Sequence, residues 1–158
     1  MPVTSAGVLL YRGAPELEVF IAHMGGPFWA AKHEGAWTIP KGEYAAESED
    51  ALAAARREFA EEIGAPAPDV ELLDLGGFRY SSGKRVHVFA GAAPEFEIEA
   101  VESNLFELEW PPRSGRRQSF PEVDDARWVP LEEARELLTK GQRPVLHALL
   151  DRLGLGLG

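Results

Sequence analysis

The chain has 158 residues, of which 45% are hydrophobic and 27% are charged, and its formal net charge is -10 at pH 7. These values fit one soluble globular domain, and no apolar run approaches the roughly 18 residues that a membrane span needs. The negative charge argues against broad binding to nucleic acids or anionic membranes. Cysteine is absent, which excludes disulfides and thiolate chemistry, and with no visible signal peptide we expect a cytoplasmic protein.

The N-terminal half reads as strands and loops that lead into one strongly helical segment. Hydrophobic and β-branched runs predict strands at 4–12 and 17–24. A glycine-rich loop at 25–36 precedes a short strand at 37–42. Residues with high helix propensity then predict a helix at 51–63.

This helix carries its own start and stop signals. Ser48 is the predicted N-cap, and Glu49 and Asp50 are expected in the first turn, where they complement the helix dipole. Gly64 is expected to end the helix. Apolar residues at helical spacing predict a buried stripe, formed by Leu52, Ala55, Phe59 and Ile63.

Strand-like runs dominate the C-terminal half until two amphipathic helices follow at 131–140 and 143–153. The strands are predicted at 70–76, 78–82, 84–93, 105–110 and 126–130. The stretch 111–125 is interpreted as a long polar loop, and the tail 154–158 is expected to be frayed. This order predicts an α/β arrangement of layers around one mixed sheet, in a single domain at 1–153.

Three acidic residues, Glu58, Glu61 and Glu62, crowd within one turn of the predicted helix. Like charges at this spacing cost about 0.2–0.5 kcal/mol per pair on an isolated helix. A divalent cation reverses that sign, and Mg²⁺ prefers hard oxygen ligands together with substrate phosphates. A solvated acidic helix face is the alternative explanation of the triplet.

The segment around the triplet resembles the signature of the Nudix hydrolases. The stretch "REFAEEIGA" (57–65) matches the second half of the signature, and Glu49 stands eight residues before Arg57, as in the family. The front departs from the pattern, because six residues rather than five separate Gly42 from Glu49. We interpret the difference as one extra residue in the loop before the helix.

The resemblance implies roles for individual residues. It assigns Glu58, Glu61 and Glu62 to a divalent metal, Mg²⁺ or Mn²⁺, with the Gly42 carbonyl as a further ligand. It implies that Arg57 orients Glu58 through a charge-assisted hydrogen bond. Glu49 is implied to support the metal ligands from further out.

A second segment, "FPEVDDARWVP" (120–130), resembles the dinucleoside-polyphosphate and RNA 5′-pyrophosphate branch of the family. The branch has a metal-facing Glu six residues before a Trp, which corresponds to Glu122 and Trp128. Glu122 is therefore the first candidate for the general base and a further metal ligand. Glu107 and Glu109, on a predicted strand, are the alternatives, together with a carboxylate of the signature itself.

The substrate needs local cations and aromatic rings on an acidic protein. The same branch resemblance, through "WTIPKG" (37–42), places Lys41 at the site. The candidates for substrate binding are Lys41, Tyr80, Arg113, Arg116 and Arg117. The arginines are candidates because a guanidinium fork suits phosphate oxygens, and the alternative is a solvated surface loop. Weaker candidates are Arg79, Lys84, Arg85, Phe28 and Trp29.

The resemblance implies a Nudix fold, with a mixed sheet between α-helices, and a magnesium-dependent phosphoanhydride hydrolase. The first choice of substrate is a dinucleoside polyphosphate such as diadenosine tetraphosphate. The alternatives are a nucleoside triphosphate, then ADP-ribose or a nucleotide sugar, and a Nudix domain that binds a nucleotide without turnover. The expected partner is a small nucleotide, on a monomer or homodimer that binds no membrane.

Overall fold

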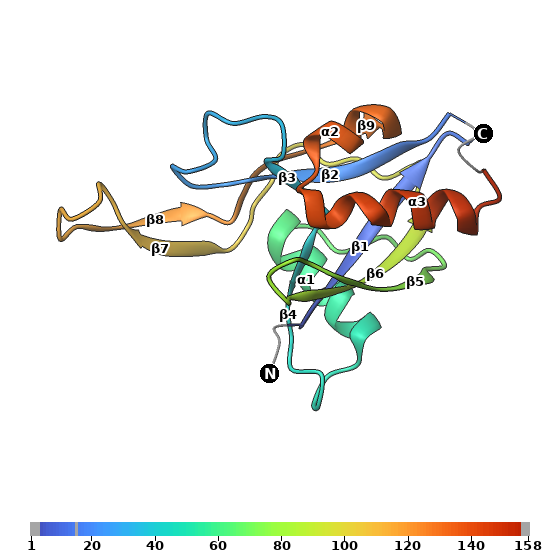
Figure 1. The fold of residues 1–158 in the computed structure, drawn as a ribbon, viewed down its shortest axis with the longest axis horizontal. Coiled ribbons are helices and arrows are strands. Elements are labelled where there is room, and N and C mark those ends of the chain that lie inside the picture. Colours follow the sequence, from blue (N-terminus) through green and yellow to red (C-terminus); the bar gives the residue numbers. More distant parts are fainter. Residues whose placement is uncertain (1–3, 15, 156–158) are drawn as a thin grey trace.

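A mixed β-sheet lies between helices on both faces in the computed structural model, which describes residues 4–14 and 16–155 (Figure 1). The prediction of an α/β fold with a mixed sheet between helices is confirmed. The strands are β1 (Thr4–Arg12), β2 (Glu18–Met24), β3 (Trp37–Thr38), β4 (Lys41–Glu43), β5 (Leu73–Arg79), β6 (Arg85–Ala92), β7 (Leu105–Glu109), β8 (Arg117–Pro121) and β9 (Val123–Pro130). The helices are α1 (Ala51–Ile63), α2 (Leu131–Leu137), α3 (Arg143–Arg152) and the 3-10 turn η1 (Lys140–Gln142).

Strand β1 is the centre of the sheet, whose main order is β3-β2-β1-β6-β5. It runs parallel to β6 from Thr4, opposite Arg85, to Tyr11, opposite Ala92. The first part of β1 also pairs with the short strand β4, which places Gly42 opposite Ala6. Strand β9 pairs with β2. The pairing of β4 with β1 places β4 against α1.

Successive residues of β1 enter two different cores, because side chains alternate between the faces of a strand. Val8 and Leu10 pack in the cluster with Phe59 of α1, whereas Leu9 packs with Leu146 and other residues of α3. Figure 1 shows α3 crossing the face of the sheet opposite to that of α1. Burial on both faces explains why β1 reads as a continuous apolar run.

Helix α1 has the predicted span but a different N-cap. Asp50, not Ser48, is the N-cap: its carboxylate accepts a hydrogen bond from the Ala53 N–H at 3.1 Å. Glu49 lies before the helix rather than in its first turn. At the other end Gly64 adopts a left-handed conformation, φ 87°, and its N–H donates to Ala60. Of the predicted stripe, Ala55, Phe59 and Ile63 are buried and Leu52 is half-buried against the same core.

The interpretation of 111–125 as a long polar loop is wrong. This stretch contains β8 and the start of β9, and β8 pairs with β7 in an antiparallel hairpin that projects from the body of the domain (Figure 1). Phe106 stands opposite Phe120, and Glu109 stands opposite Arg117. Because most of β8 is exposed, its sequence lacks the apolar alternation by which strands are recognised.

Smaller differences concern the ends of elements. The strands predicted at 70–76 and 78–82 form one strand, β5, which bends at Gly76 where the register shifts. Helix α2 ends at Leu137 rather than at residue 140. Leu155, in the tail expected to be frayed, packs against the core and donates its N–H to Leu150 at 2.8 Å. Residues 156–158 lie outside the described residues. None of the described helices is long and apolar enough to cross a membrane.

Candidate active site

A cavity of about 780 Å³ lies between α1, β4, the β5–β6 turn and the segment 139–142. Many of the candidate residues proposed from the sequence meet there. The candidates that line it are Lys41, Gly42, Glu58, Glu61, Glu62, Tyr80 and Glu122. These residues come from four separate parts of the chain, so the fold and not local sequence brings them together.

The acidic side of the cavity is formed by α1. Glu58 and Glu62 are only 9% and 7% exposed, whereas Glu61 is half-buried. Their positions flank the buried stripe, so the carboxylates lie at the edge of the core, next to β4. Helix α1 therefore holds two carboxylates in a buried environment, where charged side chains are rare.

Gly42 allows this close approach between β4 and α1. A Cβ atom at this position would lie 1.7 Å from Oε2 of Glu58 and 2.1 Å from its Cδ. Any other residue would therefore displace the Glu58 carboxylate or the strand. Gly42 has a steric role that is independent of whether its carbonyl contacts a metal.

Arg57 connects the carboxylates on the outer side of the helix. Its Nη1 donates to Oε1 of Glu58 at 2.8 Å and to Oε2 of Glu61 at 3.2 Å. Its Nε and Nη2 donate to the two oxygens of Glu49 at 2.8 and 2.7 Å. Hydrogen bonding to Glu49 raises the pKa of Arg57, and the same bond lowers the pKa of Glu49. Arg57 therefore holds the carboxylates of Glu49, Glu58 and Glu61 together.

Burial raises the pKa of three carboxyl groups in the cavity. The pKa of Glu62 rises to about 8, mainly by desolvation, and the charges of Glu122 and Glu58 raise it further. Desolvation also raises the pKa of Glu58, against the effect of its bond to Arg57. The pKa of Glu122 is raised by partial burial and by the charges of Glu61 and Glu43. Each of these groups is therefore destabilised as an anion, by burial and by the charges of neighbouring carboxylates.

Lys41 is the cation whose charge acts on both Glu62 and Glu122. Its charge lowers the pKa of both Glu62 and Glu122 against the larger effect of burial. Its backbone N–H also donates to Oε2 of Glu62 at 3.3 Å. Lys41 therefore neutralises the acidic side only in part, because the pKa of both carboxyl groups stays raised.

The donor set fits a hard divalent cation. Carboxylate oxygens are the ligands that Mg²⁺ prefers, and the mutual repulsion recorded in the raised pKa values is what a bound cation would remove. The Glu58 carboxylate occupies the space that a side chain at position 42 would fill. Among the described residues, no three His or acidic side chains converge as they stand into a set that could hold an ion.

The cationic candidates are divided by the structure. Arg113, Arg116 and Arg117 belong to the projecting hairpin and are exposed, and none of them lines the large cavity. Lys84 and Arg85, the weaker candidates, do line it. They follow the β5–β6 turn, where Ser81 and Ser82 also face the cavity, two residues that sequence reasoning missed. The Ser-Ser-Gly-Lys stretch between the two strands is the signal that could have identified this turn.

Tyr80 forms a fixed wall of the cavity. Its hydroxyl accepts a hydrogen bond from Nε2 of Gln142 at 2.9 Å, and the same nitrogen donates to Thr38 at 2.8 Å. The tyrosine ring lies against Gly141, where a Cβ atom would come within 2.4 Å of Cδ1. Gln142 is 1% exposed, and nothing in its local sequence indicated a place in the site.

The alternatives to Glu122 lie elsewhere. Glu107 and Glu109 are on the exposed face of β7. They line neither this cavity nor a smaller cavity of about 240 Å³ that adjoins it. Glu107 pairs with Arg117 at 3.6 Å, and Glu109 accepts a bond from the N–H of Arg113 at 2.8 Å. Glu122 is thus the carboxylate outside α1 and β4 that faces the cavity, among the described residues.

Comparison with protein families places these features in context. The family model described as NUDIX domain matches residues 1–149. A curated relative, an uncharacterised 17.7 kDa protein of Enterobacteria phage T4, is 30% identical over 159 residues, which cover 97% of this chain and 96% of that protein.

Solved structures show the same fold. The Ap4A hydrolase of C. elegans in a binary complex is 21% identical, with a TM-score of 0.67 over 95% of this chain and 98% of that chain. A mutT/nudix family protein of Listeria innocua is 19% identical, with a TM-score of 0.64 over 98% and 96%. The NUDIX domain of Shewanella oneidensis NrtR, complexed with ADP ribose, is 16% identical, with a TM-score of 0.62 over 97% and 89%. At these identities the likeness concerns the fold alone.

Proposed function

The chain belongs to the Nudix family, and from this premise we propose that it is a magnesium-dependent hydrolase of a nucleoside polyphosphate. The bond cleaved is a phosphoanhydride. The preferred substrate is a dinucleoside polyphosphate such as diadenosine tetraphosphate. The observation that carries the proposal is the cavity in which Glu58, Glu62 and Glu122 face Lys41 with raised pKa values.

The acidic residues would hold the metal. Glu58, Glu61 and Glu62 are the proposed ligands, with Glu122 and the Gly42 carbonyl as further oxygen donors. A bound Mg²⁺ neutralises phosphate charge and lowers the pKa of water. Arg57 keeps Oε1 of Glu58 engaged at 2.8 Å, so the other oxygen of Glu58 is the one turned toward Gly42.

Glu122 is the proposed general base. Its carboxylate would take a proton from the attacking water, and a raised pKa makes it a better proton acceptor than an exposed glutamate. Its backbone is fixed on both sides, because its N–H donates to Asn104 at 2.9 Å and its carbonyl accepts from Gly25 at 2.9 Å. The acceptor therefore sits on a rigid support beside the residues of α1.

The substrate phosphates would lie against the cationic wall. Lys41, Lys84 and Arg85 all line the cavity, on an otherwise acidic protein of net charge -10. A phosphate chain reaching from α1 toward the β5–β6 turn would meet these side chains. We therefore transfer the phosphate-binding role from the hairpin arginines to Lys84 and Arg85.

Replacing Lys84 by Ala is expected to raise the KM for a tetraphosphate-bridged substrate about twofold to fivefold, with little change in kcat. An exposed charge pair contributes up to about 1 kcal/mol, and each tenfold change corresponds to about 1.4 kcal/mol. Arg116→Ala is the matched control, since it removes one positive charge at a site outside the cavity. Steady-state kinetics at two salt concentrations checks this, because screening should weaken the effect of Lys84. Equal increases in KM for the two variants would contradict the assignment.

A substrate panel tests the proposed function itself. Purified protein is incubated with diadenosine tetraphosphate, a nucleoside triphosphate, ADP-ribose or a nucleotide sugar, with Mg²⁺ or with EDTA, and the products are identified by chromatography. Hydrolysis with Mg²⁺ and none with EDTA is expected, fastest for the dinucleoside polyphosphate. Faster cleavage of another member would replace the preferred substrate. Binding of a nucleotide without turnover under either condition would identify a non-catalytic Nudix domain.

A further inference from the structure

A second, smaller cavity of about 240 Å³ adjoins the first. The two cavities share several lining residues, among them Lys41, Glu62 and Glu122. These three residues therefore lie at the junction of two lobes. The large cavity, lined by Tyr80 and Lys84, is the first lobe, and the smaller cavity is the second lobe. A substrate centred on the junction has room to extend into both.

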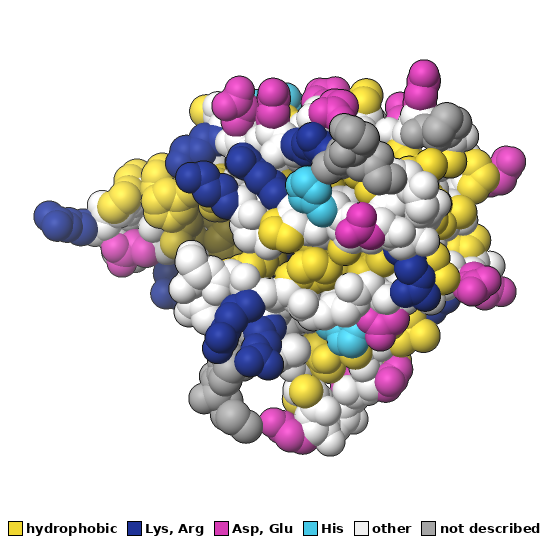
Figure 2. Space-filling model, turned by 45° about the vertical axis from the view of Figure 1, so that its right-hand side comes forward, with side chains coloured by type: hydrophobic (Ala, Val, Ile, Leu, Met, Phe, Trp, Pro, Cys, Tyr) yellow, Lys and Arg dark blue, Asp and Glu magenta, His cyan; other side chains and the backbone are white. Residues whose placement is uncertain are grey.

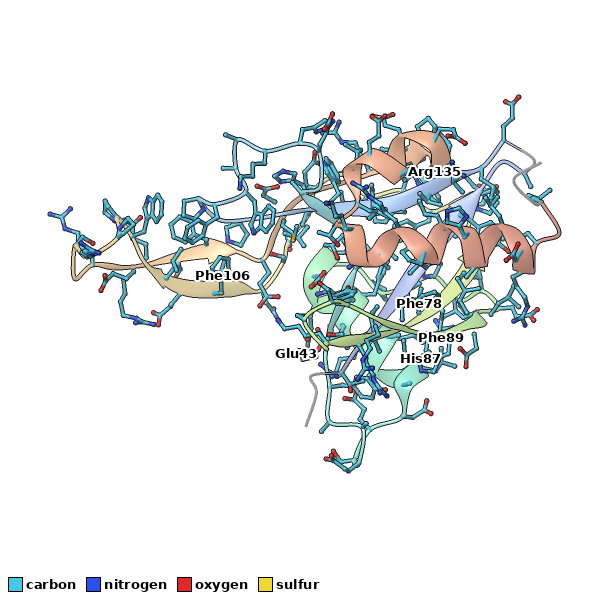
Figure 3. All side chains as sticks on the ribbon, in the orientation of Figure 1. Glu43, Phe78, His87, Phe89, Phe106 and Arg135 are labelled. Carbon is cyan, nitrogen blue, oxygen red and sulfur yellow. The ribbon has the colours of Figure 1, made fainter. Side chains whose placement is uncertain are left out.

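The second lobe is aromatic where the first is polar. Trp29, from the loop 25–36, and Phe106, from β7, line it. The polar turn residues Ser81 and Ser82 line the large cavity only. Figure 3 shows Phe106 on the projecting hairpin, and Figure 2 shows hydrophobic side chains gathered over that end of the molecule, where its surface is hollowed.

The hairpin and the loop close on each other through specific contacts. A Cβ atom at Gly26 would lie 2.8 Å from Cζ of Phe106, so the loop backbone approaches the ring directly. Farther out, Phe28 meets Trp110 edge to face, with ring centroids 5.6 Å apart. On the hairpin itself Phe106 contacts Phe120, with centroids 6.1 Å apart. The lobe is thus a formed space with aromatic walls, continuous with the carboxylates.

Aromatic walls select planar, apolar groups, because rings offer stacking and edge-to-face contacts. A nucleobase is such a group, and base stacking on aromatic side chains does not depend on a particular base. The phosphate chain of a bound nucleotide must lie near Lys41 and the carboxylates. A ring in the aromatic lobe would then belong to the end of the substrate beyond the junction.

We infer that the lobe between the loop 25–36 and the β7–β8 hairpin binds the second ring-bearing group of the substrate. This inference rests on the proposed phosphoanhydride hydrolase. The lobe favours substrates that carry a nucleoside at each end of the phosphate chain over substrates that carry one. Trp29 and Phe106 are the residues that determine this preference.

The test compares diadenosine tetraphosphate with adenosine 5′-tetraphosphate, which has the same number of phosphates but one nucleoside fewer. Phe106→Leu is expected to raise the KM for the first substrate at least fivefold more than the KM for the second. Trp29→Leu, on the opposite wall, is a second variant should the first fail to fold. Leu105→Ala is the matched control: Leu105 is 64% exposed on the same hairpin and lines neither cavity. It should change neither KM.

Equal changes in KM for both substrates, or none, would overturn the inference. Its failure is distinct from failure of the proposed function. If the wild-type protein cleaves neither compound, the proposed function fails for them, and calorimetric binding of the same pair in the presence of Mg²⁺ tests the lobe. Loss of affinity that is greater for the two-ended compound in Phe106→Leu supports the lobe, whereas equal loss, or no binding to the wild type, overturns it.

Discussion

Replacing Glu62 by Gln is expected to lower kcat at least about a hundredfold while the fold is retained. Glu62 is a proposed metal ligand, and removing its charge removes electrostatic stabilisation of the transition state that is worth several kcal/mol. The side chain is 7% exposed and its pKa is raised to about 8. A neutral amide of almost the same shape should therefore be accepted by the core, and the loss should be one of catalysis.

The same substitution should change how stability depends on pH in EDTA. The pKa of Glu62 is about 8 in the folded protein and about 4.3 in an unfolded chain. Folding therefore favours the protonated form, and its contribution to stability, complete below the unfolded pKa, is lost as the pH rises through about 8. Melting temperatures between pH 5 and pH 9 should fall less in Glu62→Gln than in the wild type.

Adding Mg²⁺ should reverse this difference. Metal and proton compete for the carboxylate, so the rise in melting temperature caused by Mg²⁺ should grow with pH in the wild type. The rise should be much smaller in Glu62→Gln. Glu47→Gln is the matched control, because Glu47 is exposed in the loop before α1 and lines neither cavity. A folded Glu62→Gln protein with near-wild-type turnover and an unchanged response to Mg²⁺ would refute the assignment.

The sequence was most informative where periodicity and steric requirements act locally. Strand β1 is buried on both faces, so its apolar run identified it. Helix α1 was predicted with correct bounds, because its helix formers end at Gly64. The family signature indicated that Gly42 belongs to the site, but not that it contacts Glu58. The steric clash that requires glycine at position 42 appears only once β4 and α1 are in contact.

Features that depend on how distant segments meet could not be predicted. The close spacing of Arg113, Arg116 and Arg117 in the sequence predicted a phosphate site. Spacing does not show in which direction a hairpin projects, and this hairpin holds the three arginines outside the cavity. Lys84 was only a weaker candidate, because the sequence around it does not show that the β5–β6 turn places it in the same cavity as the carboxylates of α1. Gln142 joins Tyr80 to Thr38 from a 3-10 turn far along the chain, and no local pattern records such a contact.

Solvent exposure explains the failure at β8. An exposed strand of a two-stranded hairpin needs apolar residues only where it contacts its partner or the neighbouring loop, and in β8 that residue is Phe120. The polar remainder was therefore interpreted as a loop. The aromatic lobe depends on this hairpin, so the part of the site formed by Phe106 was missed with it.

Replacing Glu122 by Gln is expected to lower kcat about a hundredfold or more and to change KM much less. General-base catalysis typically contributes a factor of about 10²–10⁴, and Gln cannot accept the proton. Glu122 stands at the junction of the two cavities on a backbone fixed by bonds to Asn104 and Gly25, so the substitution should leave the site in place. The raised pKa of Glu122 also predicts an acidic limb in the pH dependence of kcat that lies above the ordinary range of a glutamate.

Below that limb the carboxyl group is protonated and cannot act as a base, so the rate of the wild type should rise with pH as the group ionises. The variant should lose this limb, and kcat measured from pH 4 to pH 9 at saturating substrate and Mg²⁺ checks it. Glu107→Gln and Glu109→Gln are matched controls, because each removes one carboxylate from β7 without touching either cavity. If Glu122→Gln kept the limb and the rate while one of these controls lost them, the base would lie on the hairpin. If all three kept them, the proton would pass to a carboxylate of α1, where Glu58, with its raised pKa, is the next acceptor to replace.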